Sequence, residues 1–144
     1  MGQERTQRVF IEGPLPGLNK FIASAKENGF RHGKNGRRFN RYAAIKKHWT
    51  ELIDLVCKAQ GIRPVRGPAS FHFTWIEKDR RRDPDNLAAG GRKLILDGLV
   101  KAGILENDGW KHVQGWTDEF DIARGARRPG VLVIIKGRTR GGSN

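Results

Sequence analysis

The chain has 144 residues, of which 37% are apolar, and a formal net charge of +13. This length suits one compact domain with a modest core, and so large a positive charge favours a polyanionic partner, most commonly nucleic acid. The single cysteine, Cys57, excludes an intramolecular disulfide and a thiolate zinc cluster. No apolar run approaches the ~20 residues that span a bilayer, and the polar start does not resemble a secretory signal. We therefore expect a cytoplasmic protein without a membrane partner.

The first part of the chain predicts one strand, two helices and a basic loop. A short strand is expected over 9–12 (VFIE), closed by Gly- and Pro-containing turns, and a short helix over 18–28. Residues 29–41 are basic, rich in Gly and Asn and without periodicity, which indicates a flexible loop. From 42 to 59 apolar residues recur at three- and four-residue spacing, as on one face of an amphipathic helix, and Cys57 lies on that face as a buried core thiol.

A strand and a second long helix follow. Residues 69–77 (ASFHFTWIE) alternate aromatic residues on one face, the pattern of a half-buried strand. The helix is expected to begin at Asn86 or Gly91 and to end at Lys101, with Gly103 as its C-terminal glycine.

The last part of the chain predicts two more extended segments. Residues 110–121 predict a twisted strand, 131–136 (VLVIIK) predict a strong one, and the Gly- and Arg-rich tail 137–144 is expected to fray. The order β-α-α-β-α-β-β predicts a single α/β (α+β) domain over 1–144, in which a small mixed four-stranded sheet carries helices.

The most informative stretch is Asp83-Pro84-Asp85-Asn86, an acidic cluster in a basic chain. Proline disfavours the helical region for the residue before it, so Asp83 should be extended. Side chains at i and i+2 of an extended chain point the same way, which predicts that the two carboxylates lie together. A hard divalent cation such as Mg²⁺, which takes one or two carboxylates plus waters and phosphate oxygens, would offset their repulsion. Taken alone, an ordinary turn with a helix cap is the alternative.

A third acidic residue, Asp108, lies in Glu106-Asn107-Asp108-Gly109, directly after the second long helix. The helix that leaves Asp85 cannot by itself return Asp108 to the same place. The return requires the segment 110–121 to pair near the strand 69–77, which is a topological assumption. A routine turn is the alternative for this run.

In combination these motifs resemble the signature of the RusA family of crossover junction endodeoxyribonucleases, which are Holliday junction resolvases. The run RDPDNL followed by KLILDGLVKAGILENDGW is similar to the family's D-x-D-N pair, its helix with a lysine and a glycine, and a further aspartate just after that helix. The resemblance covers residues 70–120 and extends weakly to PLPGLNK near the start.

The resemblance implies an α/β homodimer that uses Mg²⁺, with Mn²⁺ as a substitute, to resolve four-way DNA junctions by paired symmetric nicks in recombination and repair. It assigns metal binding and catalysis to Asp83, Asp85 and Asp108, and it assigns the essential helix lysine to Lys93, which stands four residues before Asp97 in the matching run KLILDGL. It also implies a bacterial, phage or prophage setting.

The position of Lys93 depends on the conformation of 88–91 (Ala-Ala-Gly-Gly), because the chain carries about one extra helical turn before this lysine compared with the family. If these residues form a loop, Lys93 can approach the carboxylates. If they are helical, Lys93 lies over ~10 Å along the axis from Asp85, and Arg92 becomes a rival. A solvated lysine paired with Asp97 at i,i+4 is the third possibility.

Excess positive charge beside the acidic cluster predicts a DNA-binding surface made of phosphate contacts. The basic residues of the loop and of the turn before the aspartates are the expected contacts: Arg31, Lys34, Arg37, Arg38, Arg41, Arg80, Arg81 and Arg82. Symmetric cutting needs two sites, which a twofold dimer supplies, and its interface is expected on 69–77 or 131–136. Two functional alternatives stay open: a non-catalytic basic nucleic-acid-binding module, and a nuclease that acts on other branched DNA.

Overall fold

The computed structural model describes residues 3–17, 41–125 and 127–139; the predicted helix 18–28 and most of the predicted loop 29–41 lie outside them. The described residues form four strands and two helices. In chain order these are β1 (Gln3–Glu12), α2 (Arg41–Ala59), β2 (Val65–Glu77), α3 (Pro84–Lys101), β3 (Val113–Ile122) and β4 (Gly130–Thr139). Neither of these helices is long and apolar enough to cross a membrane.

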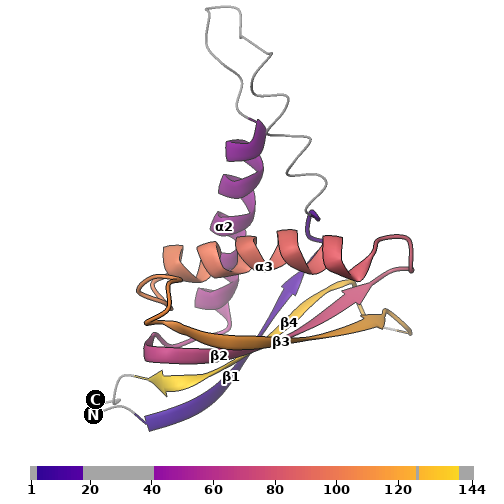
Figure 1. The fold of residues 1–144 in the computed structure, drawn as a ribbon. Helices are drawn as coiled ribbons and strands as arrows, with labels where there is room; N and C mark the ends of the chain where they lie inside the picture. Colours follow the sequence, from indigo (N-terminus) through magenta and orange to yellow (C-terminus); the bar gives the residue numbers. More distant parts are fainter. Residues whose placement is uncertain (1–2, 18–40, 126, 140–144) are drawn as a thin grey trace, which may run out of the picture.

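The strands form one mixed sheet in the order β1-β4-β2-β3 (Figure 1). β4 is antiparallel to both of its neighbours, whereas β2 and β3 are parallel. Parallel neighbours need a crossover connection, and α3 supplies it, so β2, α3 and β3 form a βαβ unit. The predicted α+β domain with a mixed four-stranded sheet is confirmed, and so is the pairing of β3 beside β2.

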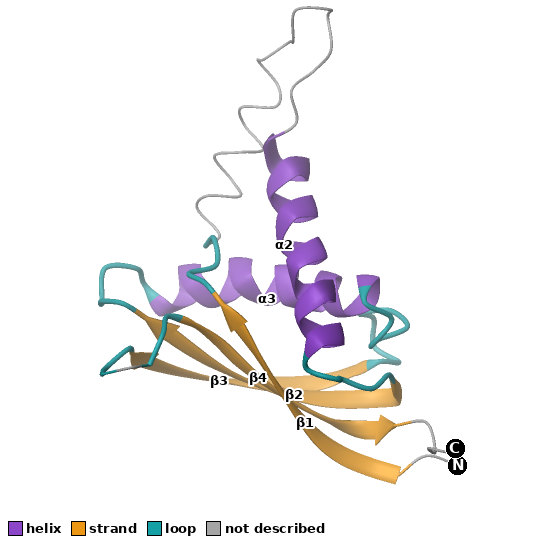
Figure 2. Ribbon diagram, turned by 180° about the vertical axis from the view of Figure 1, so that it is seen from behind, coloured by secondary structure: helices purple, strands orange, loops and turns teal. Residues whose placement is uncertain are grey.

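Both helices lie on the same face of the sheet (Figure 2). Phe71, Phe73 and Trp75 of β2 are buried beneath them with stacked rings, as the alternating pattern predicts. This apolar face and that of 131–136, the two expected dimer interfaces, are therefore both part of the core of the single chain. Cys57 is 1% exposed, which confirms the buried thiol, and burial, with the charge of Asp54, raises its pKa to about 11.

The segment 88–91 is part of helix α3, and its glycines have a packing role. A Cβ added to Gly91 would lie 2.5 Å from Cζ3 of Trp75, and one added to Gly98 would lie 2.7 Å from Ile53 of α2. Glycine at these positions allows α3 to lie directly on the sheet and against α2. α3 is therefore one continuous helix, and the direction of each of its side chains follows from helical spacing.

The first and last strands of the chain, β1 and β4, are longer than predicted. Residues 137–139, expected to fray, continue β4 and pair with the polar start of β1, where Gln3 lies opposite Thr139. Thr139 is 1% exposed. The prediction failed here because ladder hydrogen bonds from two neighbouring strands order a segment whose composition is that of a tail. Residues 140–144 lie outside the described residues.

Candidate active site

The candidate site lies where the carboxyl ends of the parallel strands β2 and β3 meet the start of α3, on the right-hand side of Figure 1. Crevices outside the carboxyl ends of parallel strands are the common ligand sites of α/β sheets. An open groove lies at this edge. Its charged lining residues are Asp83, Asp85, Arg92 and Asp118.

Asp83 and Asp85 present free carboxylates to this groove. Asp83 has φ −69° and ψ 141°, the extended conformation that Pro84 predicts, and it occupies the N-cap position without a capping hydrogen bond from its side chain. Asp85 follows in the first turn of α3, and both residues are exposed. Among the described residues neither carboxylate has a hydrogen bond or an ion pair. The turn and helix start of the alternative interpretation are present here, but no side-chain capping hydrogen bond accompanies them.

Asp108 lies beyond the opposite end of α3, in the exposed turn before β3. The 18 residues of α3 separate the two ends by roughly 27 Å at ~1.5 Å per residue. β3 starts at that far end, where Val113 pairs with Ala69. In the described part of the chain no group of three or more His, Cys, Asp or Glu residues could hold a metal ion. The expectation that one chain brings its three aspartates together is therefore wrong, because the parallel strand returns toward the groove only after Asp108.

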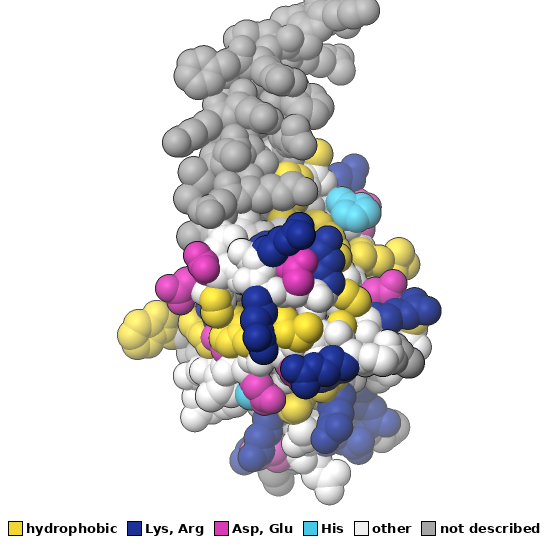
Figure 3. Space-filling view, turned by 90° about the vertical axis from the view of Figure 1, so that its right-hand side faces the viewer, with side chains coloured by type: hydrophobic (Ala, Val, Ile, Leu, Met, Phe, Trp, Pro, Cys, Tyr) yellow, Lys and Arg dark blue, Asp and Glu magenta, His cyan; other side chains and the backbone are white. Residues whose placement is uncertain are grey.

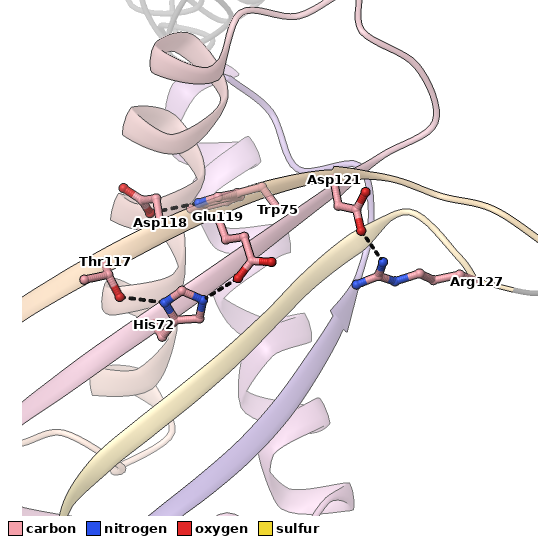
Figure 4. Close-up of polar contacts among 7 residues, drawn as sticks. All are labelled: His72, Trp75, Thr117, Asp118, Glu119, Asp121 and Arg127. Atoms are coloured by element: carbon pink, nitrogen blue, oxygen red, sulfur yellow. Dashed lines mark hydrogen bonds and ion pairs between the residues drawn. The ribbon is translucent and has the colours of Figure 1, made fainter.

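The acidic residue that β3 does bring to the groove is Asp118, which was not selected from the sequence. Asp118 lies opposite Phe73 in the ladder. Its Oδ1 accepts a hydrogen bond from Trp75 Nε1–H at 2.9 Å (Figure 4), and its Oδ2 accepts one from the Arg92 guanidinium. The available sequence signal was its place between Trp116 and Phe120 at two-residue spacing, which puts all three on one face of the strand.

Arg92 is the basic residue of α3 that faces the groove. It stands seven positions after Asp85, and residues at i, i+3, i+4 and i+7 share one face of a helix. Its guanidinium carbon lies 4.7 Å from the centroid of the Trp116 ring and 5.7 Å from that of Phe73. Its Nε is buried and has no hydrogen-bond partner among the described residues. Two aromatic rings and Asp118 therefore fix the guanidinium in the groove that the acidic pair also lines.

Lys93 points elsewhere. Its side chain is 58% exposed and its Nζ lies 3.5 Å from Asp97, the i,i+4 pairing considered as the third possibility. Lys46 of α2 pairs with the same carboxylate at 3.5 Å. The prediction that Lys93 reaches the carboxylates is wrong, because 88–91 are helical and successive helix residues differ by ~100° in direction.

The arginines of the turn between β2 and α3 have different surroundings. Arg80 and Arg81 are exposed, and Arg81 pairs weakly with Asp79 at 3.6 Å. Arg82 donates two hydrogen bonds to the Glu77 carboxylate, at 2.8 and 3.0 Å, and one to the Leu15 carbonyl at 2.6 Å. Arg82 therefore holds the turn in place and is not free to bind phosphate.

The other expected DNA contacts lie outside what the structure describes. Arg41 begins α2, and its side chain is not described. The rest of this set are Arg31, Lys34, Arg37 and Arg38.

His72 belongs to the other face of the sheet. Its Nδ1 lies 2.6 Å from Thr117 Oγ1 and its Nε2 lies 3.2 Å from Glu119 (Figure 4). Because side chains alternate along a strand, this cluster faces away from the groove.

A cavity of about 330 Å³ adjoins the groove on the side of the β2–α3 turn. The two hollows share Asp83, Pro84 and Phe120. Figure 3 shows this end of the molecule, where apolar side chains gather at the centre with Lys, Arg, Asp and Glu side chains around them. At the cavity wall, the Ile122 backbone N–H and the Arg127 guanidinium lower the pKa of Asp121 (Figure 4). The Asp121 carboxylate is thus occupied by these two partners, whereas that of Asp83 has no partner among the described residues.

Comparison with protein-family models finds no match for the chain, and comparison with curated proteins finds none either.

Proposed function

We propose that the chain is a metal-dependent DNA endonuclease that cuts branched DNA, with the four-way junction as its substrate, by paired symmetric nicks. The observation that carries the proposal is the pair Asp83 and Asp85, whose exposed carboxylates have no cationic partner among the described residues of a chain with net charge +13. Unpaired anions in a groove repel DNA phosphates, so a protein that only bound DNA would gain nothing from them. A nuclease gains a site for a cation.

The donor set fits Mg²⁺. Two neighbouring carboxylates with exposed oxygens match an ion that takes one or two carboxylates and completes its octahedron with waters and phosphate oxygens. Asp83 and Asp85 would hold it, and Mn²⁺ would substitute. When bound, the ion supplies Lewis acidity at the phosphate and lowers the pKa of a water molecule. Asp108 of the same chain takes no part in this two-carboxylate site.

Arg92 would hold the scissile phosphate. A guanidinium presents several N–H donors in a planar fork, which suits phosphoryl oxygens, and one fixed in advance loses little freedom when it binds. Trp116, Phe73 and Asp118 provide that fixation here. Its charge would stabilise the negative charge that grows on the phosphoryl oxygens during cleavage.

The test is cleavage of a synthetic four-way junction in Mg²⁺ by the wild type, by Asp85→Asn and by Glu51→Gln. Glu51 is an exposed carboxylate on α2 and serves as the matched carboxylate-to-amide control. We expect paired nicks from the wild type and from Glu51→Gln, and a loss on the order of 100-fold or more in Asp85→Asn. Absence of nicking by the wild type would leave the non-catalytic module as the function, and undiminished nicking by Asp85→Asn would exclude Asp85 from the catalytic site.

The substrate is tested in parallel on flap, fork and linear duplex DNA. Faster cutting of a flap or a fork than of the four-way junction would mean that the protein is a nuclease whose substrate is that other branched DNA. Paired cuts need two sites, so we propose that a homodimer acts on the junction. Sedimentation of the protein with and without junction DNA measures this, and a monomer on the cut junction would contradict it.

A further inference from the structure

The cavity of about 330 Å³ beside the groove has mainly apolar walls. Trp75 and Leu87, which are 0% and 3% exposed, are part of its lining, together with Pro84 from the start of α3 and Ile122 from the end of β3. Phe120 borders both the cavity and the groove and is 43% exposed. An aromatic ring at the opening of an apolar cavity offers a face on which a flat ring can stack.

Most charged residues around this cavity are already paired. Arg82 is bound to Glu77, and Arg127 holds Asp121. Arg80 differs, because its exposed guanidinium group has no partner among the described residues, and the exposed Arg124 acts on Asp121 through its charge without a hydrogen bond. They belong to the turn before α3 and to the segment after β3. Exposed guanidinium groups at the rim of a cavity with mainly apolar walls match a ligand with a flat apolar body and flanking phosphates.

We propose that this cavity receives one unpaired nucleobase of the DNA, next to the phosphate bound at Asp83 and Asp85, with the base stacked on Phe120 and the flanking phosphates held by Arg80 and Arg124. The inference rests on the proposed function. The cavity and the groove share Asp83 and Pro84, so a base in the cavity would lie beside the phosphate that is cut in the groove. A base must leave its stack to enter the cavity, and this is easiest where it is already unpaired. The cavity thereby selects branch points over continuous duplex.

The experiment uses four-way junctions in which a single abasic residue is moved one nucleotide at a time across the branch point. Binding is measured in EDTA, so no cleavage is needed. For one position of the abasic residue, we expect the wild type to bind the junction on the order of tenfold more weakly than it binds the intact junction. This is the loss that follows from removing one base–aromatic stack. Phe120→Ala should bind the intact junction as weakly as that abasic one and show no further loss.

The matched control is Trp110→Ala, which removes an aromatic ring that is 99% exposed and lies outside the cavity. It should keep the position-dependent loss. Arg124→Gln should weaken binding equally for intact and abasic junctions, as expected of a phosphate contact. Thermal unfolding confirms that each variant folds.

The failure of this inference and that of the nuclease are distinguishable. If the wild type binds all abasic junctions equally, or Phe120→Ala keeps the wild-type preference, the cavity does not hold a base, whatever the cleavage assay gives. If binding depends on the position of the abasic residue and on Phe120, but no branched DNA is cut in Mg²⁺, the cavity binds a base and the protein is not an endonuclease.

Discussion

Arg92 and Lys93 are neighbours in the chain with opposite surroundings. Arg92 is 16% exposed, lies between two aromatic rings and pairs with Asp118, whereas Lys93 is 58% exposed and pairs with Asp97 on the outside of α3. A fixed guanidinium loses little entropy on binding a phosphate, while a solvated lysine must first be ordered. The two positions therefore form a natural pair for assigning the basic role in the site.

We expect Arg92→Lys to lower single-turnover junction cleavage by on the order of 100-fold, because an ammonium group keeps the charge but loses the planar fork of donors. Lys93→Ala should stay within about threefold of the wild type, since the group it removes is engaged with Asp97. The measurement is the cleavage rate at saturating enzyme and Mg²⁺. Thermal unfolding of Arg92→Lys shows whether the loss of cleavage comes from a destabilised fold. A larger loss of cleavage rate in Lys93→Ala than in Arg92→Lys would mean that Lys93, and not Arg92, binds the scissile phosphate.

At the scale of elements, the direct contact of α3 with the sheet sets the geometry of the site. Gly91 lies against the indole of Trp75, whose Nε1–H is bonded to Asp118. The same contact that seats the helix thus also fixes the carboxylate that holds Arg92. Movement of α3 on the sheet would change the distance between Arg92 of α3 and Asp118 of β3.

A double-mutant cycle tests this contact. Gly91→Ala should destabilise the fold by about 1–3 kcal/mol, because overpacking against Trp75 outweighs the gain of about 1 kcal/mol that Ala has over Gly in a helix. In a Trp75→Phe background, which removes the atoms that clash, the same change should be neutral or stabilising. Urea unfolding of the four proteins measures both steps. Equal effects of Gly91→Ala in the two backgrounds would mean that Trp75 is not what requires the glycine.

The elements that could be predicted from the sequence are those with a strong local pattern. The apolar spacing of α2, the alternation of Phe71 and Phe73 in β2, and the effect of Pro84 on Asp83 all act within a few residues, so local physics sufficed. The lengths of β1 and β4 did not follow, because pairing between distant strands orders their polar ends.

The candidate site was predicted in part for the same reason. The extended conformation of Asp83 depends on local geometry and was found, whereas Asp85 already lies in the first turn of α3, and both residues line one groove. The choice between Arg92 and Lys93 depended on whether a Gly-Gly pair is helical, which its contact with Trp75 decides. Asp118 depends on the parallel register of β3 against β2, a non-local quantity that the β3 segment alone does not contain.

For the whole molecule, the acidic pair opposes the overall charge. A net charge of +13 favours a polyanionic partner such as DNA, while the groove at the start of α3 holds two carboxylates without a partner in the described part of the chain. Without a divalent cation, these carboxylates would repel the phosphate that the proposed function brings to the groove. With a divalent cation bound, the carboxylates and the phosphate would both be attracted to the ion between them. Cation removal should therefore abolish cutting while the basic surface still binds DNA.

We expect the double variant Asp83→Asn/Asp85→Asn to bind a four-way junction several-fold more tightly than the wild type in EDTA at about 50 mM salt. The difference in affinity should shrink at about 200 mM salt, because screening increases. Mg²⁺ should raise the affinity of the wild type more than that of the variant, because only the wild type has carboxylates for the ion. The matched control, Glu51→Gln/Glu106→Gln, removes two exposed carboxylates away from the groove and should change affinity less. Loss of wild-type binding in EDTA would make the cation part of recognition. Equal binding by the variant and the wild type would mean that the phosphate does not approach this pair.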